Sequence, residues 1–141
     1  PGRGSYFLLA EALLGIDLIP DAPFAPDRCG SCTRCIEACP TQCILPNRTL
    51  DAGRCISYLT IENKGAIPPH LRPRMGGWVF GCDVCQEVCP WNRRFASPAA
   101  EAAFAPRPGL PAPNLTAELG LTPQQFNRKF KGSPVKRAKR R

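Results

Sequence analysis

Residues 29–40 read CGSCTRCIEACP, and residues 82–90 read CDVCQEVCP. The first stretch has the spacing C-x2-C-x2-C-x3-C-P, and the second repeats its last part, C-x2-C-x3-C-P. Cys55 lies alone between them, and Cys43 completes a total of nine cysteines in 141 residues. Aromatic residues make up only 8% of the chain. This composition predicts that metal–thiolate bonds, rather than a large apolar core, stabilise the fold.

The spacing of the cysteines predicts how they are shared between two metal sites. Two residues between cysteines let a loop fold around one iron–sulfur cubane, while Cys39, one helical turn beyond Cys35, carries its thiolate to a second. The first run is the bacterial ferredoxin spacing, in which the fourth cysteine ligates the other cluster. We therefore predict two [4Fe–4S] clusters. The first set is Cys29, Cys32, Cys35 and Cys89, and the second set is Cys39, Cys55, Cys82 and Cys85.

Two other uses of cysteine fit the sequence less well. A disulfide framework needs an oxidising compartment, and nine is an odd number. Two structural zinc sites could use C-x2-C pairs, but the C-P endings are not typical of zinc sites. Cys43 is left over, and we expect it to be a small buried residue beside the first site, with a sensing thiol as the alternative. Trp78, Phe80 and Trp91 flank the second stretch and are expected to shield it from water.

The formal charge of +8 is confined to one end of the chain. Residues 1–127 hold eleven basic and eleven acidic side chains, so residues 128–141 supply the whole surplus. Such a basic run favours a polyanionic partner. Residues 5–19 are mostly apolar and fit a helix or a buried strand, but they are too short for the ~20 residues of a membrane span. The chain starts with Pro1 and stops within the basic run, so we expect it to be part of a longer protein.

Local signals predict several further elements. Asp51 is expected to cap a helix that runs through Cys55 toward residue 62. Residues 97–114 contain five prolines and read as a connector. Thr122 is followed by Pro123 and, three residues after the cap, by a glutamine, which predicts a capped helix. Phe126 and Phe130 would share one face of that helix, Gly132 would end it, and Ser133–Pro134 would start another.

Three segments together resemble the epoxyqueuosine reductases: RCISYLTIE at 54–62, FGCDVCQEVCPWN at 80–92 and GSPVKRAKRR at 132–141. The resemblance covers nearly the whole chain, and the 16-residue step from Cys39 to Cys55 and the 27-residue step from Cys55 to Cys82 fit it. It implies an oxidoreductase that reduces an epoxide on the modified wobble base of tRNA. The implied cofactors are two [4Fe–4S] clusters and a cobalamin, in a fold related to the reductive dehalogenases.

The resemblance also implies a domain plan of the α+β class. Residues 1–19 would end an N-terminal cobalamin-binding domain, and residues 20–96 would form a ferredoxin-like domain with two clusters. Residues 97–114 would be the proline-rich connector, and residues 115–141 the start of a helical, HEAT-like module that binds tRNA. The catalytic acid of the family belongs to the N-terminal domain, so the resemblance assigns no catalytic residue to this chain.

Site residues follow from the same resemblance. Ser57, Cys82 and Asp83 would border the cobalamin, nearest the second cluster. Five basic residues would contact the anticodon region of tRNA through its phosphates, namely Lys64, Lys136, Arg137, Lys139 and Arg140. The implied protein is a cytoplasmic monomer, not bound to a membrane, that receives electrons from a donor protein. Two alternatives stay open: a stand-alone ferredoxin-type electron carrier, and a dehalogenase-like enzyme acting on small molecules. The basic tail favours the tRNA enzyme over both.

Overall fold

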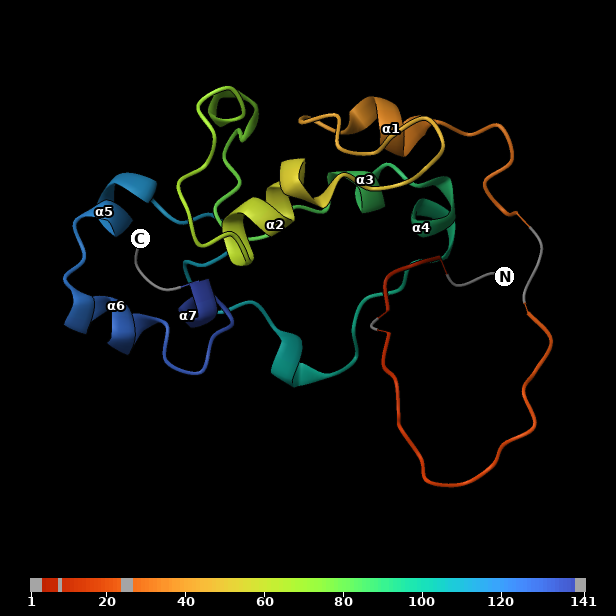
Figure 1. Cartoon of the computed structure of the whole chain (residues 1–141). Helices are drawn as coiled ribbons and strands as arrows, with labels where there is room; N and C mark the ends of the chain where they lie inside the picture. Colours follow the sequence, from red (N-terminus) through yellow and green to blue (C-terminus); the bar gives the residue numbers. More distant parts are fainter. Residues whose placement is uncertain (1–3, 8, 24–26, 139–141) are drawn as a thin grey trace.

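A computed structural model describes residues 4–7, 9–23 and 27–138 of the chain. Within these residues, short helices are joined by long connections (Figure 1). The α-helices are α1 (Arg34–Ala38), α2 (Ile56–Ile61), α3 (Val84–Glu87), α4 (Pro90–Phe95), α5 (Leu115–Leu119), α6 (Pro123–Lys129) and α7 (Val135–Ala138). Three 3-10 turns are η1 (Ala52–Arg54), η2 (Arg72–Arg74) and η3 (Ala102–Phe104). In these ranges the β structure is a single antiparallel bridge between Ile44 and Leu50, so the α+β prediction is not confirmed.

The two cysteine-rich stretches pack against each other through α1 and α3. Cys39 and Cys89 each follow one of these short helices with extended backbone angles, and this directs the chain out of the helix. Pro40 lies in a turn, whereas Pro90 is the first residue of α4, a position where the missing N–H of proline has no cost. The C-P endings therefore serve different purposes in the two stretches.

A small apolar core lies beside these stretches. Ile56 and Leu59 of α2 pack with Leu71 and Met75, which flank η2, and all four are buried. Trp78 and Cys82 are partly buried against this cluster. A core of this size agrees with the prediction that apolar packing is not the main source of stability.

The predicted cap of α2 is wrong. Asp51 precedes the separate turn η1, and its side chain makes no capping hydrogen bond. Cys55 occupies the N-cap position of α2 instead, with φ −69° and ψ 128°. Because this extended residue interrupts the helical backbone, one continuous helix from 51 to 62 cannot form. Cys55 is thereby placed immediately before the first residue of α2.

The apolar N-terminal segment forms neither of the elements that we predicted for it. The described residues 4–7 and 9–23 contain no helix and no strand; Ser5 contacts Asn92 of α4, and residues 9–23 follow an open path away from the helices (Figure 1). Its large side chains are exposed, including Leu9 (89%), Leu13 (98%) and Ile19 (97%). The described helices include none that is long and apolar enough to cross a bilayer.

The C-terminal helices follow the sequence prediction closely. Thr122 and Gln125 form a reciprocal capping box at the start of α6. The rings of Phe126 and Phe130 lie 4.7 Å apart between centroids. Gly132 has a φ of 67°, a left-handed conformation that favours glycine, and it reverses the chain between α6 and α7. Helix α7 then packs against α2.

Candidate metal centre

The first set of predicted cluster ligands lines one cavity. Cys29, Cys32, Cys35 and Cys89 all border a space of about 280 Å³, together with Cys85. Three of these residues come from the loop before α1 and from α1 itself, and Cys89 comes from the start of α4. The fold thus collects thiols that are far apart in the sequence around one space large enough for an inorganic cluster.

Polar contacts fix the loop that carries Cys29. Its backbone amide donates to Asp27 Oδ1 over 2.8 Å, and the guanidinium of Arg48 donates to Asp27 and to the carbonyl of Gly30. The Cys29 amide first, and then Arg48, hold the pKa of Asp27 below its usual value. From the other side, the indole N–H of Trp91 donates to the carbonyl of Arg28 over 2.9 Å. Trp91 also lines the cavity.

The second set comes from three places: Cys39 follows α1, Cys55 is the N-cap of α2, and Cys82 and Cys85 lie just before and within α3. Burial raises the pKa of the Cys82 thiol, and the nearby charges of Cys55 and Cys39 raise it further. Burial likewise raises the pKa of Cys85, with added repulsion from Cys82 and Cys55. Cys82 therefore lies within electrostatic reach of Cys39, Cys55 and Cys85, while Cys85 is also within reach of Cys35 of the first set, whose cavity it lines. Thiolates crowded in this way repel unless a cation lies among them, which is the chemistry of a metal–thiolate site.

Within the described residues, no three His, Cys, Asp or Glu side chains are close enough together to surround a single metal ion. The case for the two clusters therefore rests on the cavity that the first set lines and on the mutual charges of the second set. Both sets fit groups that are held by thiolates from several directions, so the donor chemistry agrees with the cluster prediction.

Cys43 is buried as predicted, at 3% exposed, but it is not among the residues that line the cavity of the first set. Its sulfur is 3.4 Å from the sulfur of Cys39, a member of the second set. Burial and the hydrogen bond toward Cys39 raise the pKa of Cys43 to about 12. Burial alone would raise the pKa of Cys39, but hydrogen bonds from Cys43 and from Thr41 outweigh it and bring that pKa to about 7. The C-x3-C spacing of Cys39 and Cys43 indicates this contact, because a single turn can bring Cys43 back to the sulfur of Cys39.

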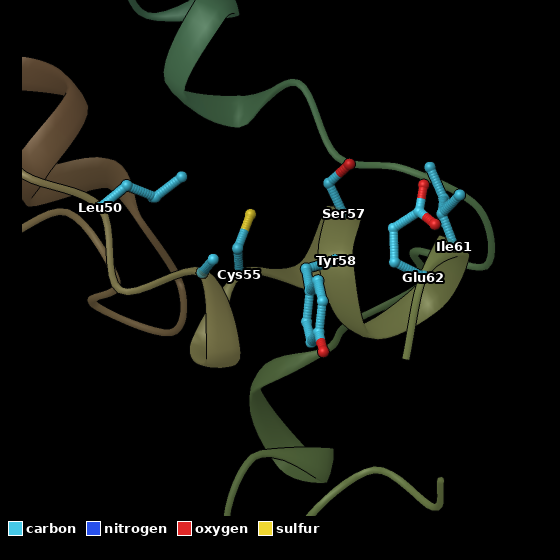
Figure 2. A pocket seen from close by; sticks show the side chains of 7 residues that line it. Leu50, Cys55, Ser57, Tyr58, Ile61 and Glu62 are labelled. Atoms are coloured by element: carbon cyan, nitrogen blue, oxygen red, sulfur yellow. The ribbon is translucent and has the colours of Figure 1, made fainter. Parts of the chain in front are cut away.

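One of the three predicted cobalamin contacts lies at a pocket. A hollow of about 260 Å³ runs along one side of α2, and Ser57 borders it together with Cys55, Tyr58 and Glu62 (Figure 2). Cys82 and Asp83 are not among its lining residues, and Asp83 is exposed at the start of α3. A corrin ring is much larger than this hollow. The residues that line the hollow could therefore form one wall of a cobalamin site but not a complete site.

Three of the five predicted tRNA contacts fall within the described residues. Lys64 is exposed in the loop after α2, and Lys136 is exposed on α7. Arg137 of α7 is also exposed, and it forms a salt bridge with Glu62 at the end of α2. Lys139 and Arg140 lie outside the described residues. Arg137 therefore links helix α7 to the end of the helix that follows Cys55.

Comparison with known proteins defines the class. Residues 28–92 match the 4Fe-4S double cluster binding domain, so this segment is an iron–sulfur domain with two cluster sites. Over 136 residues the chain is 50% identical to the epoxyqueuosine reductase of Cyclobacterium marinum, covering 96% of this chain and 43% of that protein. It is 46% identical over 134 residues to the epoxyqueuosine reductase of Escherichia coli, covering 95% of this chain and 35% of that protein.

Solved structures give the same relationship. A crystal structure of epoxyqueuosine reductase with a tRNA-Tyr epoxyqueuosine-modified tRNA stem loop matches with a TM-score of 0.69 and 37% identity, covering 85% of this chain and 33% of that one. Epoxyqueuosine reductase from Streptococcus thermophilus matches with a TM-score of 0.68 and 33% identity, covering 86% of this chain and 31% of that one. The chain is therefore a relative of the epoxyqueuosine reductases over nearly its whole length, which confirms the resemblance seen in its motifs. It spans less than half the length of these relatives.

Proposed function

We propose that this chain is the iron–sulfur and tRNA-binding part of an epoxyqueuosine reductase, which reduces epoxyqueuosine to queuosine in tRNA. The observation that carries the proposal is the meeting of Cys29, Cys32, Cys35 and Cys89 at one cavity inside the double-cluster segment. The 50% identity to a curated relative supports the specific activity.

Under this proposal, the two sets of four cysteines each hold one [4Fe–4S] cluster. When bound, clusters pass single electrons and a cobalamin supplies a cobalt centre that can reduce an epoxide carbon. Two side chains of this chain would assist these cofactors. Trp91, which lines the first cavity, would keep water from it. Ser57 on α2 would offer a polar group to the cobalamin beside the second set. We extend the cobalamin contacts to Cys82 and Asp83, which belong to the stretch that packs against α1.

The proposal includes the domain plan and the partners. Residues 1–19 would belong to a cobalamin-binding domain, 20–96 to a ferredoxin-like domain, 97–114 to a connector and 115–141 to a HEAT-like module. Helices α5, α6 and α7, joined by short turns, support the last assignment. Lys64, Lys136, Arg137, Lys139 and Arg140 would contact the anticodon region of tRNA. The protein would act as a cytoplasmic monomer that receives electrons from a donor protein.

The test uses the full-length protein that contains this chain, purified without oxygen. We expect about eight iron atoms per chain and a broad absorbance near ~400 nm, together with bound cobalamin and conversion of epoxyqueuosine in tRNA. The variant Cys89→Ser should lose iron from one cluster and should lose conversion. A protein that carries both clusters but neither binds cobalamin nor converts the tRNA would instead be an electron carrier, and the proposal would be wrong. Conversion by a protein that contains zinc and no iron would contradict the cluster assignment.

A further inference from the structure

Three hydrogen-bond donors converge on the sulfur of Cys39. The sulfur of Cys43 lies 3.4 Å from it, and the backbone amide of the same residue donates to it over 3.4 Å. The hydroxyl of Thr41 lies 3.7 Å away. A sulfur that binds iron is a thiolate and can only accept hydrogen bonds, so the protons in these contacts come from Cys43 and Thr41. This cluster of contacts is formed by five consecutive residues.

The local backbone directs these donors at Cys39. Gln42 has a φ of 52°, in the left-handed region, and its amide donates to the carbonyl of Cys39 over 3.1 Å. The resulting turn brings the following residue back to the sulfur that began it. Arg54 donates to the carbonyl of Thr41 over 2.8 Å and thereby fixes the turn from outside. Because an ordinary residue rarely adopts a positive φ, the turn needs these contacts to persist.

Burial makes the contacts effective. Thr41 is 0% exposed, Cys43 is 3% exposed and Cys39 is 9% exposed. Water cannot readily replace either donor, and a hydrogen bond in such a place is electrostatically stronger than one in water. A hydrogen bond to a sulfur ligand withdraws electron density from it and stabilises the added negative charge of a reduced cluster. These donors should therefore raise the reduction potential of whichever cluster Cys39 ligates.

We propose that Cys43 and Thr41 are positioning residues that hold the Cys39 thiolate and raise the reduction potential of the cluster of the second set. This inference rests on the proposed function, because it requires the two clusters. The second set includes Cys55, which borders the pocket along α2. A raised potential at this set favours electron flow from the first set toward that pocket. Cys43 belongs to neither ligand set. Its proposed role is to donate its thiol proton to the Cys39 sulfur, and it does not bind iron.

The test is a redox titration of the full-length protein, followed by electron paramagnetic resonance so that the two clusters are observed separately. The variant Cys43→Ala removes the side-chain donor, and Cys43→Ser is its matched control, because a serine hydroxyl still donates. The pair Thr41→Val and Thr41→Ser repeats the comparison at the second donor. Iron is counted in every variant before titration.

We expect Cys43→Ala and Thr41→Val each to retain all their iron and to lower the midpoint potential of one cluster only. The double variant should lower it further, while both serine variants should stay close to the wild type. Unchanged potentials in Cys43→Ala would overturn the inference, and so would loss of half the iron, which would make Cys43 a ligand. A wild-type protein without two clusters would overturn the proposed function, and the inference would fall with it.

Discussion

At the scale of single residues, Asn92 connects the N-terminal segment to the metal centre. It is 2% exposed, and its amide donates over 2.9 Å both to the carbonyl and to the side-chain oxygen of Gln86. Its own oxygen accepts from the Ser5 amide over 2.6 Å. Gly4 passes so close that a Cβ there would lie 2.4 Å from this oxygen. Ser5 and Gln86 both line the first cavity, so Asn92 links two residues of its wall.

The variant Asn92→Ala should release this segment. It leaves the Ser5 amide and the Gln86 carbonyl without their partner, and because Ser5 is exposed the loss is that of an ordinary hydrogen bond, about 0.5–1.5 kcal/mol. Because ~1.4 kcal/mol is a factor of ten in an equilibrium, hydrogen exchange at the Ser5 amide should become up to about tenfold faster. Asn47→Ala is the matched control, since Asn47 makes its hydrogen bonds to Thr49 in an exposed turn. Equal exchange at Ser5 in all three proteins would show that Asn92 does not hold the segment.

The residues that the sequence predicted well are those that act locally. The spacing of Cys29, Cys32 and Cys35 indicated one cavity, because few conformations of so short a loop exist. Cys89 was assigned to the same set because, in two-cluster ferredoxins, the last cysteine of one stretch ligates the cluster of the other stretch. Asn92 and Thr41 carried no such signal. The partner of Asn92 lies 87 residues away, and Thr41 becomes important only when Gln42 takes a left-handed turn.

At the scale of elements, helix α6 depends on its N-cap residue, Thr122. Thr122 accepts from the Gln125 amide over 3.2 Å, and Gln125 accepts from the Thr122 amide over 2.7 Å. The variant Thr122→Ala should destabilise α6 by about 1 kcal/mol, the usual cost of losing an N-cap. Faster hydrogen exchange across 123–129 would report it. Thr116→Ala, an exposed position inside α5, is the control and should leave α6 unchanged. Equal effects of the two variants would mean that the capping box does not stabilise α6.

The elements that were predicted correctly are those whose determining residues lie close together in the sequence. The cap and the paired phenylalanines of α6 are contained in nine residues, and both are present as predicted. The start of α2 was mispredicted because Cys55 needs an extended backbone at the point where a helix would have continued from Asp51. The described part of residues 5–19 forms neither a helix nor a strand, although Ser5 bonds to Asn92 of α4. Their pattern alone could not distinguish a helix from a strand.

At the scale of the whole molecule, α2 joins two functions. Figure 1 shows it between the group formed by α1, α3 and α4 and the group formed by α5, α6 and α7. Its first end carries Cys55 of the second ligand set, and its last end is followed by Glu62, which pairs with Arg137 of α7. Arg107 of the connector donates to the carbonyls of Lys131 and Gly132 and fixes the turn before α7. Helix α7 is thus held against α2, which carries Cys55 at its start.

This arrangement gives the two basic residues of α7 different expected effects on RNA binding. Lys136 is exposed and should neutralise one phosphate, so Lys136→Gln should reduce the slope of log K against log salt by about 0.7–0.9. Arg137 shares its charge with Glu62, so Glu62→Gln should free Arg137 for phosphate and strengthen binding. The measurement is a salt titration of the full-length protein with a tRNA anticodon stem-loop.

Glu101→Gln is the control for the Glu62 variant. It removes one negative charge from the connector, where Glu101 caps η3, and it should change binding less than Glu62→Gln does. If Glu62→Gln instead weakens binding, the salt bridge is needed to hold α7 in position, and Arg137 acts through that docking rather than on phosphate. If Lys136→Gln leaves the slope unchanged, α7 is not part of the RNA surface. Binding to RNA would then have to involve the basic side chains of residues 128–141 that lie before or after α7.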